Sequence, residues 1–144
     1  MKKTLTKLLT LLCVCVMAFT MLACGGNDET HVIKEGDTKV VITVSNEYLT
    51  NKKTSTLVEY MEYLKEQGEL EFEIASGMVT SINGIENPAD WSSCWMLYTD
   101  DAELSNSEWG IAEYNGKTYG SAIVGAESLI IKNGCTYIWY YQTF

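Results

Sequence analysis

The sequence predicts an α+β fold, with one helix packed on one face of a mostly antiparallel sheet. Only one segment, residues 54–67, has the apolar spacing of a long amphipathic helix. The segments before and after it are short, rich in β-branched and aromatic residues, and separated by turn residues, which is typical of strands. A strand, a helix and then a run of strands indicate two packed layers in a single domain.

The first strand and the helix have the clearest local signals. Residues 38–44 are β-branched almost throughout and continuously apolar, which predicts a strand that is buried on both faces. Thr56 and Glu59 fit a capping box at the helix start, and Gly68 is expected to end the helix in a left-handed conformation. Four apolar side chains recur at helical spacing and form one stripe, which we expect to be core: Leu57, Tyr60, Met61 and Leu64.

Three further strands follow the helix. Residues 70–74 alternate strictly between apolar and acidic side chains, so they predict a half-buried strand. Residues 78–82 predict another short strand, which ends at the turn pair Asn83-Gly84. Residues 91–99 carry two tryptophans and predict a central strand after their first positions.

The last third of the chain alternates between polar and apolar segments. Residues 106–120 predict a loop with a short hairpin at Asn115-Gly116. Residues 128–131 and 135–141 predict two strands joined by a tight turn at Lys132-Asn133-Gly134.

The N-terminus has the form of an export signal. Lys2, Lys3 and Lys7 precede an apolar run at residues 8–22, and this arrangement predicts a signal peptide over residues 1–23. The run is too short for a comfortable membrane span, and no later segment is longer, so no transmembrane helix is expected. The stretch Met21-Leu22-Ala23-Cys24 resembles the lipobox of bacterial lipoproteins, which implies lipidation of Cys24. An ordinary signal peptide that is cleaved at an alanine, with Cys24 incidental, is the alternative.

The residues after Cys24 predict a spacer. Residues 24–37 are polar and glycine-containing and include the only histidine, His31, so we expect a flexible tether there. The folded domain is then expected over residues 38–144. A lipidated Cys24 would hold it at the extracytoplasmic face of the cell membrane.

Composition limits the partners of this domain. The formal net charge of −9 becomes −12 if the three leader lysines leave with a signal peptide, and the chain contains no arginine. Such a domain is a poor candidate for binding nucleic acid, which needs clustered Lys or Arg. Cys94 and Cys135 are the only cysteines after Cys24. In an exported domain they are either a disulfide or two buried thiols.

Catalytic and metal-binding patterns are missing from the sequence. Residues 38–144 contain no histidine, and no nucleophile-elbow, zinc-protease or phosphate-loop motif occurs. Asp100, Asp101 and Glu103 form the one tight acidic cluster, which we interpret as a solvated turn rather than a calcium site. The sequence therefore predicts a non-enzymatic protein without a cofactor or a metal.

Five short motifs, in their order and spacing, resemble the transcobalamin-like C-terminal domain. They are Thr56-Leu57-Val58-Glu59-Tyr60-Met61, Glu71-Phe72-Glu73, Ile82-Asn83-Gly84, Cys94-Trp95-Met96-Leu97-Tyr98 and Ile131-Lys132-Asn133-Gly134. The resemblance covers about residues 38–144 and implies a small β-grasp-like sheet with one helix, on an exported bacterial protein. In the vertebrate cobalamin carriers this domain closes over one face of the corrinoid, and Cys94-Trp95 matches the position of their aromatic-Trp pair. The resemblance therefore implies cobalamin or a related corrinoid as a possible ligand.

Two functional hypotheses remain open from the sequence. The first is a binding protein for a corrinoid or another planar or aromatic molecule, since aromatic side chains offer large contact areas. Trp109, in a polar segment, is the first candidate contact, while Trp95 and Trp139 are also explained as core residues. The second hypothesis is a protein-interaction or adhesion module that uses an exposed edge strand. The full set of candidate contacts is Trp91, Trp95, Trp109, Tyr114 and Tyr119.

Overall fold

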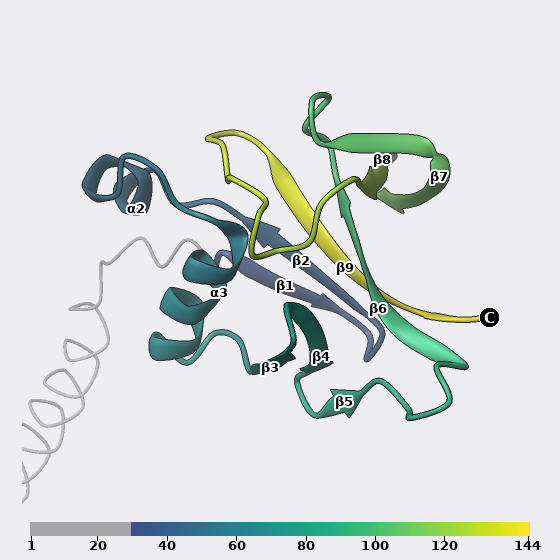
Figure 1. Cartoon of the computed structure of the whole chain (residues 1–144). Helices are drawn as coiled ribbons and strands as arrows, with labels where there is room; N and C mark the ends of the chain where they lie inside the picture. The colour runs from purple at the N-terminus through teal and green to yellow at the C-terminus, as the bar shows by residue number, and fades with distance from the viewer. Residues whose placement is uncertain (1–29) are drawn as a thin grey trace, which may run out of the picture.

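The computed structural model describes residues 30–144, which form a six-stranded sheet, a three-stranded sheet and two helices (Figure 1). Every strand pair is antiparallel, and the predicted α+β class is confirmed. The large sheet has the spatial order β1 (Val32–Glu35), β2 (Lys39–Thr43), β9 (Thr136–Thr143), β6 (Ser93–Thr99), β8 (Lys117–Ala122) and β7 (Ser105–Tyr114). The small sheet contains β3 (Phe72–Ala75), β4 (Met78–Ile82) and β5 (Ile85–Glu86), and the helices are α2 (Asn46–Asn51) and α3 (Leu57–Glu66).

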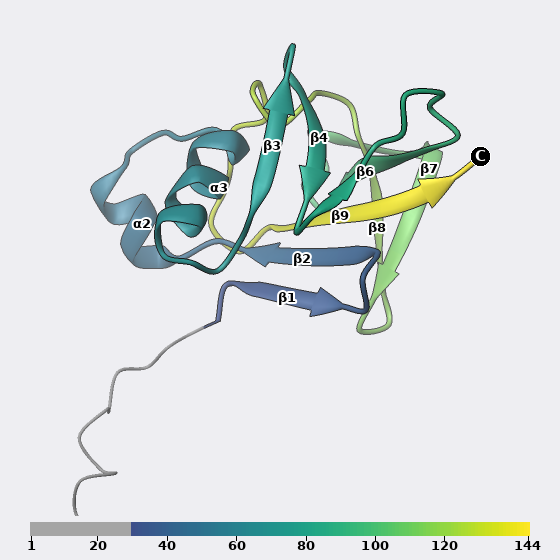
Figure 2. The same cartoon turned by 90° about the horizontal axis from the view of Figure 1, so that it is seen from below.

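Both faces of the central strands are covered. Helix α3 and the small sheet lie on one face, where β3 and β4 run across the direction of β2 and β9 (Figure 2). The β7–β8 hairpin lies on the other side, above these strands in Figure 1. In β2, Val40 and Ile42 belong to the first core cluster and Val41 to the second, and all three are buried. The continuous apolar run of β2 is thus explained by burial on both faces of the strand, as predicted.

Helix α3 begins as its sequence predicts. The Glu59 N–H donates to Thr56 Oγ1 at 3.3 Å, and the Thr56 N–H donates to Glu59 Oε2 at 2.9 Å. The four side chains of the predicted stripe have no exposed surface, and full burial of each such side chain stabilises the fold by about 1.5–3 kcal/mol. The N–H groups of Leu57 and Val58 donate to the carbonyls of Leu129 and Ala126 at 2.8 and 3.1 Å. The helix start therefore holds the segment that connects β8 to β9.

The folded domain begins earlier than the sequence predicts. Part of the expected tether over residues 24–37 forms β1, which pairs with β2 along its length. The His31 carbonyl extends the pairing by accepting the Thr43 N–H at 2.9 Å. The His31 N–H donates to the side chain of Glu69 at 3.1 Å. Only Val32 in this strand is buried. Strand β1 therefore has a mostly polar composition, which is why the sequence did not predict it.

Three other elements differ from expectation. Helix α2 is too short for a periodic pattern, and Ser45 caps it by accepting the Tyr48 N–H at 3.3 Å. The whole of the expected loop at 106–120 lies in the β7–β8 hairpin, whose turn is the predicted Asn115-Gly116 with φ values of 49° and 73°. The expected strand at 128–131 is reduced to one bridge between Ile130 and Thr56, because its neighbouring main-chain groups bond to the start of α3.

The export signal and Cys24 lie outside the described residues. None of the helices within residues 30–144 is long and apolar enough to cross a membrane.

Candidate functional site

The main candidate site lies along the part of β6 that is paired on one side only. Strand β6 pairs with β9 from Ser93 to Thr99, but it pairs with β8 only at Tyr98 and Thr99. Beyond that point β8 ends and the chain turns into residues 123–126. In an antiparallel ladder successive residues direct their main-chain groups to opposite sides, so Trp95 and Leu97 direct theirs to the unpaired side.

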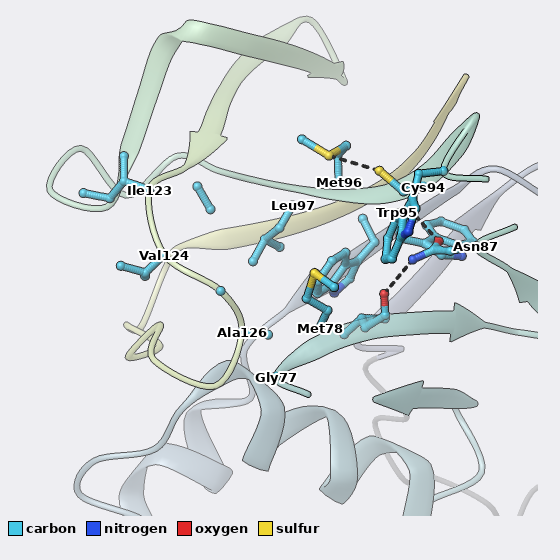
Figure 3. Close-up of a pocket in the computed structure, with 15 residues that line it drawn as sticks. Gly77, Met78, Asn87, Cys94, Trp95, Met96, Leu97, Ile123, Val124 and Ala126 are labelled. Atoms are coloured by element: carbon cyan, nitrogen blue, oxygen red, sulfur yellow. Dashed lines mark hydrogen bonds between the residues drawn. The ribbon is translucent and has the colours of Figure 1, made fainter. Parts of the chain in front are cut away.

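A pocket of about 330 Å³ lies along this open edge (Figure 3). Its wall combines the start of β4, Asn87, Trp91, the edge of β6, residues 122–126 and Trp139 of β9. No charged side chain lines it. Its largest lining side chains are Trp91, Trp95, Trp139, Met78, Met96, Leu97 and Ile123. Such a surface favours an apolar or aromatic ligand.

Asn87 fixes the back of the pocket. Its Oδ1 accepts the main-chain N–H of Trp95 at 3.0 Å, and its Nδ2 donates to the Val79 carbonyl at 3.0 Å (Figure 3). The Trp95 indole donates to the Ile85 carbonyl at 2.8 Å. The amide of Asn87 thus joins β4 to β6, and Trp95 is held in one orientation. The Trp139 indole N–H is buried and has no partner within residues 30–144.

The one titratable group in the wall is the thiol of Cys94. It lies 3.5 Å from Met96 Sδ, in hydrogen-bonding contact. Burial raises the pKa of this thiol above its ordinary value, so it is protonated at neutral pH and is a poor nucleophile.

The mouth of the pocket is apolar and exposed. Trp91 and Met78 are each 50% exposed, and Ile123 is 41% exposed. Trp91 has a φ of 56°, a conformation that bulky side chains rarely adopt. The Trp91 N–H donates to the Pro88 carbonyl at 3.0 Å, and Asp90 accepts the Ser92 N–H at 3.1 Å, so a turn maintains this geometry. A strained, half-exposed tryptophan beside other exposed apolar side chains indicates a binding surface.

The structure brings together two of the five predicted contact residues. Trp91 and Trp95 line the pocket, although Trp95 is nearly buried and also serves the core as expected. Trp109, our first candidate contact, does not line it: this side chain is 65% exposed on β7. Tyr114 and Tyr119 pack in the second core cluster, on the other face of the sheet, and do not line the pocket.

The sequence did not reveal four contributors to the pocket. Met78, Met96, Ile123 and Trp139 come from four separate segments, and only Met96 belongs to one of the five motifs. Their proximity follows from strand pairing and from the attachment of residues 126–129 to α3. Trp139 was interpreted only as a core residue, which it also is.

Cys94 and Cys135 are both free, half-buried thiols, so the disulfide alternative is wrong. Cys94 pairs with Gln142 near one end of the β6–β9 ladder, while Cys135 precedes the other end of β9. Seven residues of extended chain span about 23 Å, whereas the Cα atoms of a disulfide lie within about 7 Å. Burial, and then the charges of Asp100 and Asp101, raise the pKa of the Cys135 thiol.

The acidic cluster is an ion-pair network, not the solvated turn that we expected. The side chain of Asp101 is 4% exposed and lies 2.9 Å from Lys132 Nζ, which also pairs with Glu103. Asp100 accepts the Thr136 N–H at 2.8 Å and pairs with Lys117. The hydrogen bonds that Lys132 donates to Glu103 and Asp101 raise the pKa of Lys132. These contacts tie the β6–β7 connection to the turn before β9.

Comparison of the chain with protein-family models, with curated proteins and with solved structures found no match. The resemblance to the transcobalamin-like domain therefore rests on the five motifs alone. The ligand that this resemblance implies is therefore a proposal.

Proposed function

We propose that this protein is a lipoprotein, anchored through Cys24 at the extracytoplasmic face of the membrane, whose domain binds a small apolar or aromatic molecule. The pocket at the β6 edge supports this proposal most directly, because it combines an uncharged wall with an exposed mouth of Trp91, Met78 and Ile123. Exposed apolar groups of this kind do not stabilise the folded chain. Covering them with a ligand removes apolar surface from water and stabilises the complex.

The role that we propose is binding without chemical conversion. The pocket wall offers one titratable group, the Cys94 thiol, and burial keeps it protonated. Asn87 is engaged by Trp95 and Val79. The wall therefore supplies contact area and shape rather than acid–base groups.

The size of the pocket constrains the ligand. A volume of about 330 Å³ is near the lower end for small-molecule pockets, about 300–1,000 Å³. A two-ring aromatic molecule fits this volume. If ligand and pocket together bury about 400 Å² of apolar surface, the gross gain is about 10 kcal/mol. Association costs of about 4 kcal/mol or more reduce this gain, so we expect dissociation constants in the micromolar to millimolar range.

A corrinoid is much larger than this pocket. We propose that such a ligand, if it binds, inserts one edge or substituent between Trp91 and Ile123 and leaves the rest outside. This arrangement supports at most weak corrinoid binding by the isolated chain.

Calorimetric titration of the purified protein with naphthalen-2-ylmethanol, a neutral probe, tests the proposal. We expect saturable binding that Trp91→Ala weakens about fivefold, from the loss of an aromatic contact. Trp109→Ala is the matched control, because Trp109 is exposed but lies outside the pocket. Absence of binding, or equal losses in the two variants, would contradict the pocket as the site. Cobinamide, titrated in the same way, tests the corrinoid extension.

The proposed anchor has a separate test. Expression of the chain with Cys24→Ala in a bacterium should move the protein from the membrane fraction to the soluble extracytoplasmic fraction. Retention of the variant at the membrane would contradict lipidation of Cys24.

An interaction module is the second candidate, supported by strand β7. This strand is at the edge of the large sheet and carries Trp109 and Ile111, which are 65% and 48% exposed. Edge strands with exposed apolar side chains can pair with another chain. Trp109→Lys should abolish such pairing and leave binding of the neutral probe unchanged.

A further inference from the structure

We propose that the ligand of the β6-edge pocket is an organic monocation, with its apolar body in the pocket and its positive charge at the mouth beside Glu127. This inference rests on the proposed function, because it specifies the chemistry of a ligand for the same site. It follows from the position of one carboxylate and from the distribution of charge around the pocket.

Glu127 lies at the border of the pocket. Its Oε2 would be 3.0 Å from a Cβ placed on Gly77, and Gly77 itself lines the pocket. Gly125, another lining residue, approaches the same turn, since its Cβ would lie 3.8 Å from the Gly77 carbonyl oxygen. Hydrogen bonds of residues 125–129 to one another and to α3 fix the main chain that carries Glu127 beside this turn.

No positive charge neutralises Glu127. Its side chain is exposed, and it forms no ion pair or hydrogen bond with any residue in the part of the chain from 30 to 144. The acidic residues 100, 101 and 103, in contrast, all pair with a lysine. No lysine occurs between residues 66 and 116, a span that includes β3, β4, β5 and β6.

A second carboxylate adds to the negative potential at the mouth. Asp90 precedes Trp91, and hydrogen bonds from the main chain and side chain of Ser92 lower the pKa of Asp90. It is therefore ionised at neutral pH. Neither carboxylate forms an ion pair within residues 30–144, so the two favour cations over anions at the mouth.

The uncharged wall determines where the positive charge lies. Burial of an unpaired charge among the lining side chains would cost several kcal/mol, so the charge stays at the mouth, in contact with water and near Glu127. The exposed face of Trp91 offers a further site for a cation, because aromatic rings attract positive charge at their faces. A flat apolar body with one terminal ammonium group meets both requirements.

Three probes that share one aromatic body test this inference on the purified protein. They are naphthalen-2-ylmethylammonium, naphthalen-2-ylmethanol and 2-naphthoate, which are cationic, neutral and anionic. An exposed ion pair contributes about 0.2–1 kcal/mol, so we expect the cation to bind about 1.4-fold to fivefold more tightly than the neutral probe. The anion should bind most weakly, and added salt should reduce these differences.

Glu127→Gln should remove most of the preference for the cation and leave the affinity for the neutral probe unchanged. Glu62→Gln is the matched control: Glu62 is exposed on α3, and its loss changes the net charge of the protein by the same amount. The preference should persist in this variant. Equal effects of the two variants would assign the preference to net charge and overturn the role of Glu127.

The outcomes separate this inference from the proposed function. Equal binding of the cation and the neutral probe would overturn the inference and leave the proposed function standing. Failure of all three probes to bind would overturn both. Tighter binding of the anion would contradict the inference directly.

Discussion

Asn87 Oδ1 accepts the main-chain N–H of Trp95 at 3.0 Å, so a side chain occupies the place that a neighbouring strand would otherwise take at the edge of β6. The same amide donates to the Val79 carbonyl at 3.0 Å. The small sheet is thus joined to the large one beside the pocket.

Asn87→Ala should destabilise the protein by about 1–3 kcal/mol, because it leaves the partly buried Trp95 N–H and Val79 carbonyl without their partner. Urea unfolding, followed by far-UV circular dichroism, measures this change. Asn106→Ala is the control, because Asn106 makes only an exposed hydrogen bond to the Glu108 N–H. A loss no greater than that of the control would show that Asn87 does not stabilise this junction.

Replacement of Trp91 should reveal the strain in its turn. Glycine usually destabilises a protein relative to alanine, but at a φ of 56° the left-handed conformation penalises alanine by about 1 kcal/mol. Trp91→Gly should therefore be more stable than Trp91→Ala by about 1 kcal/mol, although both variants lose ligand affinity. The urea midpoints of the two variants measure this difference in stability. A more stable alanine variant would contradict the strained conformation.

Lys132 should stabilise the fold more than its exposure suggests, because it pairs with the buried carboxylate of Asp101. Lys132→Met should lower the urea midpoint more than Lys53→Met, which removes an exposed lysine that forms no ion pair within residues 30–144. Addition of Asp101→Asn to Lys132→Met should restore part of the loss, because the amide is not left as an unpaired charge. A double variant that is less stable than the sum of the single variants predicts would contradict this pairing.

The stability of the fold should decrease above pH 10. Burial raises the pKa of Tyr60 and of Tyr137 from 10.0 to about 12. Below pH 10 both hydroxyls are neutral in the folded and unfolded chains, and their contribution to stability is fully present. Between pH 10 and about 12 the unfolded chain loses these protons first, so the free energy of unfolding falls.

Urea midpoints measured on either side of pH 10 test this dependence. Tyr60→Phe should be less stable at neutral pH, because it loses hydrogen bonds with the Thr43 carbonyl and the Ser45 N–H, both at 3.0 Å. Its stability should also depend less on pH in the alkaline range. Tyr63→Phe is the control, since the Tyr63 hydroxyl makes no hydrogen bond within residues 30–144. An unchanged alkaline dependence in Tyr60→Phe would contradict the assignment.

The sequence predicts the elements whose cause is local. The capping box at Thr56 and Glu59, the apolar stripe of α3 and the β-branched run of β2 each depend on neighbours within a few residues. The Asn115-Gly116 turn was found for the same reason. Its flanking strands were not, because β7 contains polar residues and its register shifts between Asn106 and Ile111.

The pocket was only partly predictable. Trp91 and Trp95 stand out as tryptophans near a strand start, but Met78, Ile123 and Trp139 gain their significance from contacts between distant segments. Trp109 was expected in a polar loop, whereas the structure places it on strand β7, away from the pocket. No short motif predicts which partners the main-chain N–H and carbonyl groups at the β6 edge will have.

Strand β1 determines which shortened forms of this protein would remain soluble. A fragment that begins at Thr38, where the sequence alone places the start of the domain, lacks β1 and leaves one side of β2 without a partner. The uncovered strand reads Lys-Val-Val-Ile-Thr, a short β-branched segment of the kind that pairs with copies of itself and aggregates. A fragment that starts before His31 keeps this edge covered and is the appropriate form for concentrated samples.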